Sequence, residues 1–196
     1  NTIDEKVLED NYLLEEEQLE EPLKEITIPF KIGIVPKWIF NREFSAKSLK
    51  KWECGITDTE DLLIPIRDDR KKYVGWVVRQ ANGKTPKYVY SAGLKTSKIL
   101  FGLYNIDKNI ELLCVTEGPL DTIWLDQHSF QSVALFGLHL SRRQESLFLS
   151  KIPKEIVLCL DRDKPGIEAA RKIYDRLSKY CLISLIKIPD KYKDVQ

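Results

Sequence analysis

Acidic side chains follow two apolar stretches of the chain. Glu117 and Asp121 come after the run ELLCVT, and Asp161 and Asp163 come after the run EIVLCL. If both runs are strands of one parallel sheet, their carboxyl ends lie at the edge where such sheets bind ligands. Carboxylates held that close repel one another unless a hard divalent cation neutralises them. Mg2+ fits best, because it combines one or two carboxylates with waters and substrate phosphates, and the pattern therefore predicts phosphoryl transfer.

Each acidic group also has a simpler interpretation as a helix cap. Pro119 and Pro165 open the helices expected after the two runs, so Glu117, Asp161 and Asp163 could merely stabilise helix N-termini. For either group alone, the two interpretations are about equally good. An E-G-x-x-D segment followed by a D-x-D-x-x-G segment at the end of a second strand is harder to explain by capping, and favours the metal site.

The elements that must position these carboxylates can be predicted from hydrophobic periodicity. Apolar runs predict strands at 111–118, 132–137, 155–161 and 181–188, and the segments 119–128, 141–150 and 165–180 between them predict helices. Strands that are apolar throughout and alternate with helices are typical of a parallel sheet covered on both faces. We therefore expect an α/β fold with a central parallel sheet in this half.

The preceding half has a strand rhythm without long helices. The segments LLIPIRD, YVGWVVRQ and KYVYS are separated by the polar turns DDRKK and ANGK, which predicts an antiparallel meander. Ahead of it, Ser45 is placed to cap a short helix that runs through Trp52 and that Gly55 would close. This half is expected to be a mixed α+β subdomain.

Charge is distributed unevenly along the chain. Residues 1–25 carry ten acidic and two basic side chains, whereas residues 26–110 carry 16 Lys and Arg against 8 Asp and Glu. The first 28 residues are interpreted as an acidic linker or helix that ends between Pro22 and Pro29. The basic excess that follows is a weak indication of a polyanionic partner, since Lys and Arg contacts to phosphate supply sequence-independent affinity for nucleic acid.

Several protein classes are excluded by composition. No apolar stretch is long enough to span a bilayer and no signal peptide is present, which predicts a cytoplasmic protein with no membrane partner. The four cysteines are far apart and fit reduced core thiols. Only two histidines occur, His128 and His139, which argues against a zinc site or a His-dependent triad. The absence of methionine suggests an internal fragment of a longer protein.

The acidic segments resemble the Toprim domain shared by bacterial-type (DnaG-like) primases, topoisomerases and some nucleases. The matching pieces, in order, are TEGPLD, FGLHLS, LDRDKPG and IPDKYKD. The resemblance implies that Glu117, Asp161 and Asp163 are catalytic and hold divalent metal ions, with Asp121 close by. Asp194 matches a further metal-site aspartate of the primase branch. The second aspartate of that segment would fall on Gln196, which is a departure from the family pattern.

The basic half resembles the subdomain that precedes Toprim in these primases. LIPIRD, PKYVYS and ILFGL match its motifs, which places residues 29–108 in that subdomain and residues 109–196 in Toprim. Tyr90 stands where the family has asparagine, and such differences favour a divergent, phage-type member. Tyr88 could instead simply pack, and Trp76 is expected to do so. The resemblance implies nucleotide and template contacts by Arg67, Arg79, Lys87, Tyr88, Lys95, Lys98 and Gly118.

Taken together, the residues and the resemblance predict the catalytic core of a DNA-dependent RNA primase. Its expected cofactor is Mg2+ or Mn2+, and its expected partners are single-stranded DNA, ribonucleoside triphosphates and a replicative helicase. Two alternatives stay open: a Toprim-type nuclease in which the same metals activate water, and a non-catalytic module that binds single-stranded nucleic acid.

Overall fold

The first half of the chain forms an antiparallel sheet, as the strand pattern of the sequence predicted. The computed structural model describes residues 22–81 and 83–186. The sheet has the order β1-β2-β3-β4-β5, and all its neighbours are antiparallel. Its strands are β1 (Lys31–Ile32), β2 (Gly55–Ile56), β3 (Leu62–Arg67), β4 (Tyr73–Arg79) and β5 (Tyr88–Tyr90). Phe30 packs edge-on against Trp76 at 5.6 Å between ring centroids, so Trp76 has the packing role expected of it.

The segment between β1 and β2 holds two short helices, the 3₁₀ helix η1 (Lys37–Arg42) and α2 (Ala46–Lys51). The Ser45 hydroxyl accepts a hydrogen bond from the Ser48 N–H at 3.1 Å, so Ser45 caps α2 as predicted. The prediction that Gly55 closes this helix is wrong, because Gly55 belongs to β2. A Cβ at Gly55 would lie 2.5 Å from the Lys31 carbonyl oxygen, so glycine is required there by the close approach of β1.

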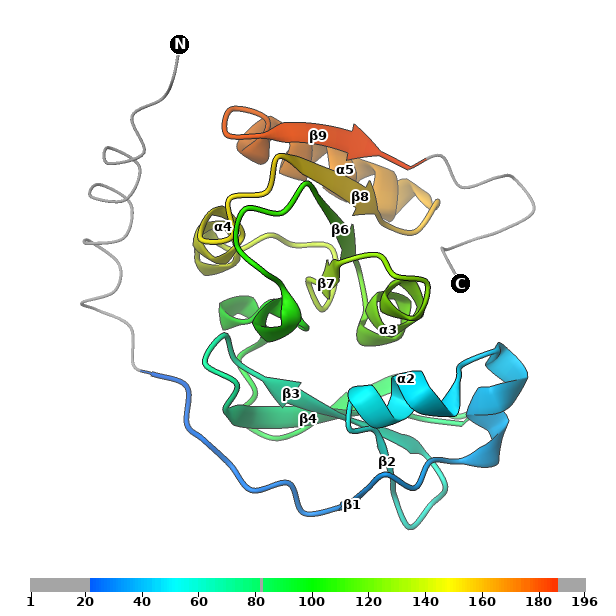
Figure 1. The fold of residues 1–196 in the computed structure, drawn as a ribbon. Helices are drawn as coiled ribbons and strands as arrows, with labels where there is room; N and C mark the ends of the chain where they lie inside the picture. Colours follow the sequence, from blue (N-terminus) through cyan, green and yellow to red (C-terminus); the bar gives the residue numbers. More distant parts are fainter. Residues whose placement is uncertain (1–21, 82, 187–196) are drawn as a thin grey trace.

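The second half is a parallel sheet of order β7-β6-β8-β9 with intervening helices, which confirms the expected α/β fold (Figure 1). Two short 3₁₀ helices, η2 (Thr96–Lys98) and η3 (Leu103–Asn105), lie in the connection from β5. The strands are β6 (Leu112–Thr116), β7 (Ser132–Ala134), β8 (Glu155–Cys159) and β9 (Leu182–Leu185). The helices are α3 (Pro119–Gln127), α4 (Arg142–Leu149) and α5 (Lys164–Leu177).

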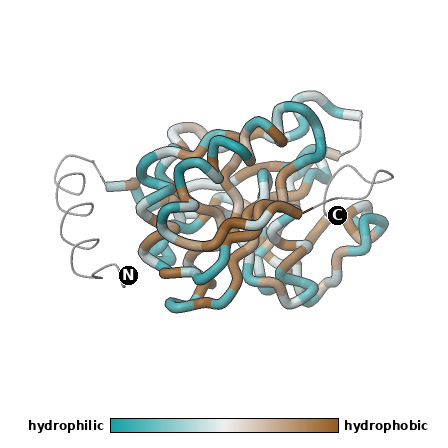
Figure 2. The backbone as a smooth tube through the Cα atoms, turned by 90° about the horizontal axis from the view of Figure 1, so that it is seen from above, coloured by the Kyte–Doolittle hydropathy of each residue, from teal (hydrophilic) through white to brown (hydrophobic). Residues whose placement is uncertain are grey.

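The two faces of the parallel sheet pack into two different hydrophobic cores, because side chains alternate along each strand. Leu113 and Val115 of β6 lie in one hydrophobic cluster with residues of α4 and α5. On the other face, α3 contributes Leu120 and Ile123 to a second cluster, which also contains the inner residues of β3 and β4. Helices therefore cover both faces, and Figure 2 shows hydrophobic segments of the backbone crossing the centre of the view with hydrophilic segments around them.

Because the second core is shared, the antiparallel sheet is held against the α3 side of the parallel sheet. The side chain of Gln127 strengthens this packing, since its amide nitrogen donates to the Glu43 carbonyl at 3.0 Å and its carbonyl oxygen accepts from the Ser45 N–H at 2.6 Å. The domain boundaries predicted after residues 28 and 108 stay predictions. None of the helices within the described residues is long and apolar enough to cross a membrane.

Candidate active site

Glu117 lies at the carboxyl end of β6, where the chain turns into α3. The buried hydroxyl of Thr116 shapes this turn through contacts with the Thr122 hydroxyl at 2.8 Å and the Gly118 carbonyl at 3.2 Å. The Glu117 carboxylate does not cap α3, whose N-cap is Gly118 without a side-chain bond. Instead, Oε1 of Glu117 accepts a hydrogen bond from the backbone N–H of Asp161 at 2.8 Å. The carboxylate therefore joins the ends of the two central strands, β6 and β8.

The two aspartates after β8 have different surroundings. Asp163 is exposed, and its Oδ1 accepts a hydrogen bond from the Gly166 N–H at 3.0 Å, so it is the N-cap of α5. Asp161 is half-buried beside Glu117. Gly166 makes this turn possible, because a Cβ there would lie 2.1 Å from the Asp161 carbonyl oxygen. The capping interpretation therefore describes Asp163, whereas Glu117 has a different role.

The carboxylates gather at one edge of the parallel sheet without forming a ready-made metal site. Asp121, in the first turn of α3, lies beside Gly118, since a Cβ at Gly118 would be 3.4 Å from its Oδ2. Within residues 22–81 and 83–186, no three His, Cys, Asp or Glu side chains are grouped closely enough to hold a metal ion. Asp194 and Gln196 lie outside the described residues. The oxygen donors suit a hard divalent cation in their chemistry.

Tyr88 of β5 extends from the antiparallel sheet to the acidic edge, by which we mean the edge of the parallel sheet that carries Glu117, Asp121, Asp161 and Asp163. A Cβ at Gly118 would lie 3.9 Å from the Tyr88 hydroxyl. Burial raises the pKa of Tyr88, and the charge of Asp121 raises it further, while the cations of Arg79 and Arg42 act in the opposite direction. The Tyr88 hydroxyl is therefore protonated at neutral pH and can donate a hydrogen bond beside the carboxylates.

Arg79 is the basic residue that the sheet register brings to Tyr88. The two residues are Cα partners across β4 and β5, and the Arg79 guanidinium lies 5.3 Å from the centre of the Tyr88 ring. Arg79 is only 5% exposed, and its Nη1 donates to the Gln80 carbonyl at 2.6 Å. Such a buried cation, fixed over an aromatic face, raises the positive potential on the basic side of the acidic edge.

The other predicted basic residues are more scattered. Arg67 forms an ion pair with Glu53 at 2.7 Å and donates a hydrogen bond to the Tyr73 hydroxyl at 2.6 Å, so its guanidinium is engaged within its own subdomain. Lys87 precedes β5 and is exposed. Lys95 is exposed and Lys98 is half-buried. They lie at the two ends of η2, a segment whose backbone carbonyls accept hydrogen bonds from Ser141 and Gln144 at the α4 N-terminus.

Sequence reasoning missed Arg42. This residue ends η1, and its positive charge acts on the Tyr88 hydroxyl together with that of Arg79. The signal in the sequence was slight, a single arginine three positions before the helix-capping Ser45. Only the folded chain brings the charge of Arg42 close enough to act on Tyr88.

Fold and site together define a Toprim-like α/β domain whose acidic strand ends face a basic antiparallel sheet. Residues 114–196 match the family model described as Toprim-like. The DNA primase of Thermotoga maritima is 29% identical over 140 residues, which are 68% of this chain and 25% of that protein. This chain therefore spans about a quarter of the length of such relatives.

Solved structures extend the likeness to both halves of the chain. The DnaG primase catalytic domain bound to single-stranded DNA matches with a TM-score of 0.67 and 20% identity, over 80% of this chain and 64% of that one. The primase fragment of the bacteriophage T7 primase-helicase matches with a TM-score of 0.63 and 17% identity, over 92% of this chain and 78% of that one. The fold is that of a DnaG-like primase catalytic core, and the resemblance seen in the sequence motifs is confirmed.

Proposed function

We propose that this chain is the catalytic core of a DNA primase, which joins ribonucleoside triphosphates into short RNA primers on single-stranded DNA. The observation that carries the proposal is the position of Glu117. Its carboxylate spans the ends of β6 and β8, and Tyr88 with Arg79 lies across from it on the antiparallel sheet. The acidic edge therefore faces a basic and aromatic surface of the antiparallel sheet, formed by Arg79 and Tyr88 and called the basic wall below. This arrangement suits a reaction that brings a triphosphate to a polyanionic template.

The acidic residues are assigned to divalent metal ions, Mg2+ or Mn2+. Glu117, Asp121 and Asp161, together with Asp163 and with Asp194 outside the described residues, are the proposed ligands. When bound, such ions lower the pKa of an attacking 3′-hydroxyl and stabilise the leaving pyrophosphate. The hydrogen bond that the Asp161 N–H donates to Oε1 of Glu117 orients the Glu117 carboxylate at the ends of β6 and β8.

The residues of the basic wall and the lysines near it are proposed to contact the phosphates and bases of the triphosphate and the template. Arg79 is held rigidly by its own contacts and by the Tyr88 ring, which favours it for binding a triphosphate or a backbone phosphate. Lys87, Lys95 and Lys98 are proposed to add charge for the template, and Gly118 leaves room for a nucleotide beside the Tyr88 hydroxyl. Arg67 is assigned here by resemblance alone, since its contacts are those of a structural ion pair.

The proposed partners follow from the same assignment. Among the similar structures, one is a catalytic domain bound to single-stranded DNA and another is a fragment of a primase-helicase. We propose single-stranded DNA, ribonucleoside triphosphates and a replicative helicase as partners of the protein to which this chain belongs, which would work in the cytoplasm of a bacterial or phage-infected cell.

Primer synthesis tests this proposal directly. Labelled ribonucleoside triphosphates and a single-stranded template are incubated with the full-length protein and Mg2+ or Mn2+, and RNA products are resolved by gel electrophoresis. The expected result is short RNA that disappears when the metal is chelated. The variant Asp161→Asn with Asp163→Asn is the matched negative control. Template cleavage without RNA would favour the nuclease, and binding without either reaction would favour the non-catalytic module.

A further inference from the structure

Strand β5 presents a second tyrosine on the same face as Tyr88. Val77 and Tyr90 are Cα partners across β4 and β5, just as Arg79 and Tyr88 are. Because side chains alternate along a strand, Tyr88 and Tyr90 point to one side of the sheet and lie about 6.6 Å apart along the chain. Tyr88 meets the acidic edge at Gly118, so Tyr90 is the next aromatic side chain along the same wall.

A ladder of aromatic rings fixes Tyr90 in place. Trp52 and Phe101, both buried, stack at 4.8 Å with an interplanar angle of 23°. Phe101 meets Phe136 at 6.0 Å, and Phe136 meets Tyr90 at 6.1 Å with an interplanar angle of 71°. Tyr90 ends the ladder and is 41% exposed. Because Phe136 touches this ring edge to face, part of the Tyr90 surface is left uncovered, on a side chain whose conformation is set by the core.

The loop that backs Tyr90 is joined to Glu117. Phe136 has a φ of 62°, a left-handed conformation that bulky residues rarely adopt. The next residue, Gly137, donates its N–H to the Glu117 carbonyl oxygen at 3.0 Å. A Cβ at Gly137 would meet nothing within 4 Å, so the space beside this loop is open. One loop therefore links the exposed ring of Tyr90 to the residue that anchors the acidic edge.

From this arrangement we infer that Tyr90, supported by Phe136, is a stacking position for the nucleobase of a ribonucleoside triphosphate. The inference rests on the proposed function, because it places the triphosphate at the acidic edge. An aromatic ring stacks on any base, since every base has a π-face. In a ribonucleoside triphosphate, the base is joined to the triphosphate through a single ribose. A triphosphate held at the acidic edge therefore places its base close to that edge, where Tyr90 is the next ring along the strand after Tyr88. A template base is not attached to the triphosphate and is not placed there by it.

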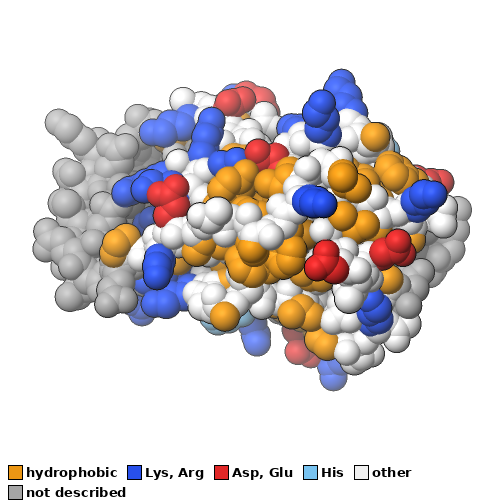
Figure 3. Space-filling model, turned by 90° about the horizontal axis from the view of Figure 1, so that it is seen from below, with side chains coloured by type: hydrophobic (Ala, Val, Ile, Leu, Met, Phe, Trp, Pro, Cys, Tyr) orange, Lys and Arg blue, Asp and Glu red, His pale blue; other side chains and the backbone are white. Residues whose placement is uncertain are grey.

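The test measures ligand binding rather than synthesis. Binding of ATP, of ribose 5-triphosphate and of single-stranded DNA is measured calorimetrically on the full-length protein with Mg2+. The variants are Tyr90→Ala, Tyr90→Leu, which keeps an apolar contact with Phe136, and Tyr90→Phe, which keeps the ring. Val89→Ala is the matched control, because Val89 is equally exposed at 41% but lies on the opposite face of the same strand from Tyr90. Figure 3 shows the molecule from the side of the antiparallel sheet, where hydrophobic and charged side chains are mixed.

Losing a stacked base should weaken ATP binding about 5- to 150-fold in Tyr90→Ala and Tyr90→Leu. Tyr90→Phe and Val89→Ala should stay within about twofold of the wild type, as should the affinity of Tyr90→Ala for ribose 5-triphosphate, which has no base. An unchanged ATP affinity, or an equal loss for both triphosphates, would overturn the inference. So would a loss confined to single-stranded DNA, which would assign Tyr90 to the template. Failure of the proposed function would appear separately, as absence of RNA synthesis by the wild type.

Discussion

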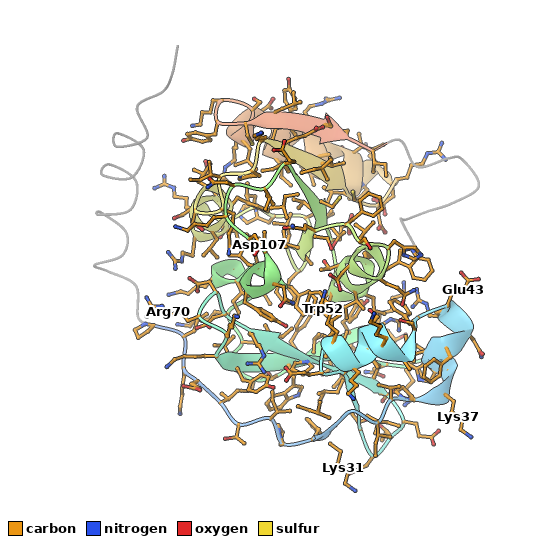
Figure 4. The ribbon with its side chains drawn as sticks, in the orientation of Figure 1. Lys31, Lys37, Glu43, Trp52, Arg70 and Asp107 are labelled. Atoms are coloured by element: carbon orange, nitrogen blue, oxygen red, sulfur yellow. The ribbon has the colours of Figure 1, made fainter. Side chains whose placement is uncertain are left out.

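The indole N–H of Trp52 donates a hydrogen bond of 2.8 Å to Asp126, which joins the antiparallel sheet subdomain to helix α3 of the Toprim-like domain. Asp126 also pairs with Lys51 at 2.6 Å. Trp52 is 2% exposed and lies between the two halves of the molecule, as Figure 4 shows. The bonds of the Asp126 carboxylate to Trp52 and Lys51 therefore help to hold the basic wall at a fixed position relative to the acidic edge.

Asp126 variants separate the buried bond from the surface ion pair. Asp126→Ala leaves the buried indole N–H unsatisfied and should lower the free energy of unfolding by about 1–3 kcal/mol. Asp126→Asn keeps an acceptor oxygen and loses only the pair with the exposed Lys51, which should cost at most about 1 kcal/mol. Urea unfolding followed by tryptophan fluorescence measures both values. Equal losses in the two variants would show that the Trp52 bond contributes nothing beyond the ion pair.

Glu117→Gln tests whether the carboxylate is chemical or architectural. Glutamine keeps a similar size and an oxygen that can accept from the Asp161 N–H, so the melting temperature should change little. Removing the negative charge should cut the rate of primer synthesis by about 10²-fold or more. Affinity for single-stranded DNA, measured by fluorescence anisotropy, should stay nearly constant. A variant that is less stable but fully active would contradict the catalytic assignment.

Asp163 has two possible roles that two substitutions can separate. Asparagine is as good an N-cap as aspartate, so Asp163→Asn should leave the stability of α5 unchanged. Asp163→Ala removes the acceptor for the Gly166 N–H and should cost about 1 kcal/mol. If Asp163 is also a metal ligand, both variants lose synthesis activity. Full activity in a stable Asp163→Asn variant would restrict this residue to capping.

Lys87 is the exposed cation best placed for a test of template binding. Lys87→Ala should weaken affinity for single-stranded DNA of any sequence, and should reduce the slope of log K against log salt by about 0.7 for one lost phosphate contact. Binding isotherms at several salt concentrations give that slope. The exposed Lys31, at the far edge of the antiparallel sheet, offers a matched control that should leave the slope unchanged. An unaltered slope for Lys87→Ala would place its side chain on a solvated face.

Asp61 makes the stability of the antiparallel subdomain depend on pH. Burial opposes its ionisation, but hydrogen bonds from Lys84, Ala81 and Thr59 outweigh this effect and lower its pKa below the ordinary 3.8. The ionised carboxylate therefore stabilises the fold above the unfolded-state pKa, and this contribution is lost as the pH falls through the lowered pKa. Unfolding measured between pH 2 and pH 6 should show the loss, and Asp61→Asn should remove it. Identical pH profiles for the two proteins would contradict the assignment.

Hydrophobic periodicity determined the elements and the fold class of this protein. A run such as IVLCL, apolar throughout, is typical of a strand buried on both faces, and its alternation with helices indicates a parallel sheet. The carboxyl ends of such strands meet at one edge, so the order of residues along the chain is enough to place Glu117, Asp121 and Asp161 at one edge of the sheet. The order of the sequence motifs was likewise enough to predict the likeness to DnaG-like primases.

Tertiary structure decided what each side chain does at that edge. Asp163 differs from Asp161 because the backbone turns between them and points one carboxylate at the N-terminus of α5. The charge of Arg42 acts on Tyr88 only in the folded chain, and Tyr90 meets Phe136 because the two sheets share a core. These contacts join residues far apart in the chain. Local patterns constrain only near neighbours, and the direction of a side chain across an interface depends on the packing of both elements.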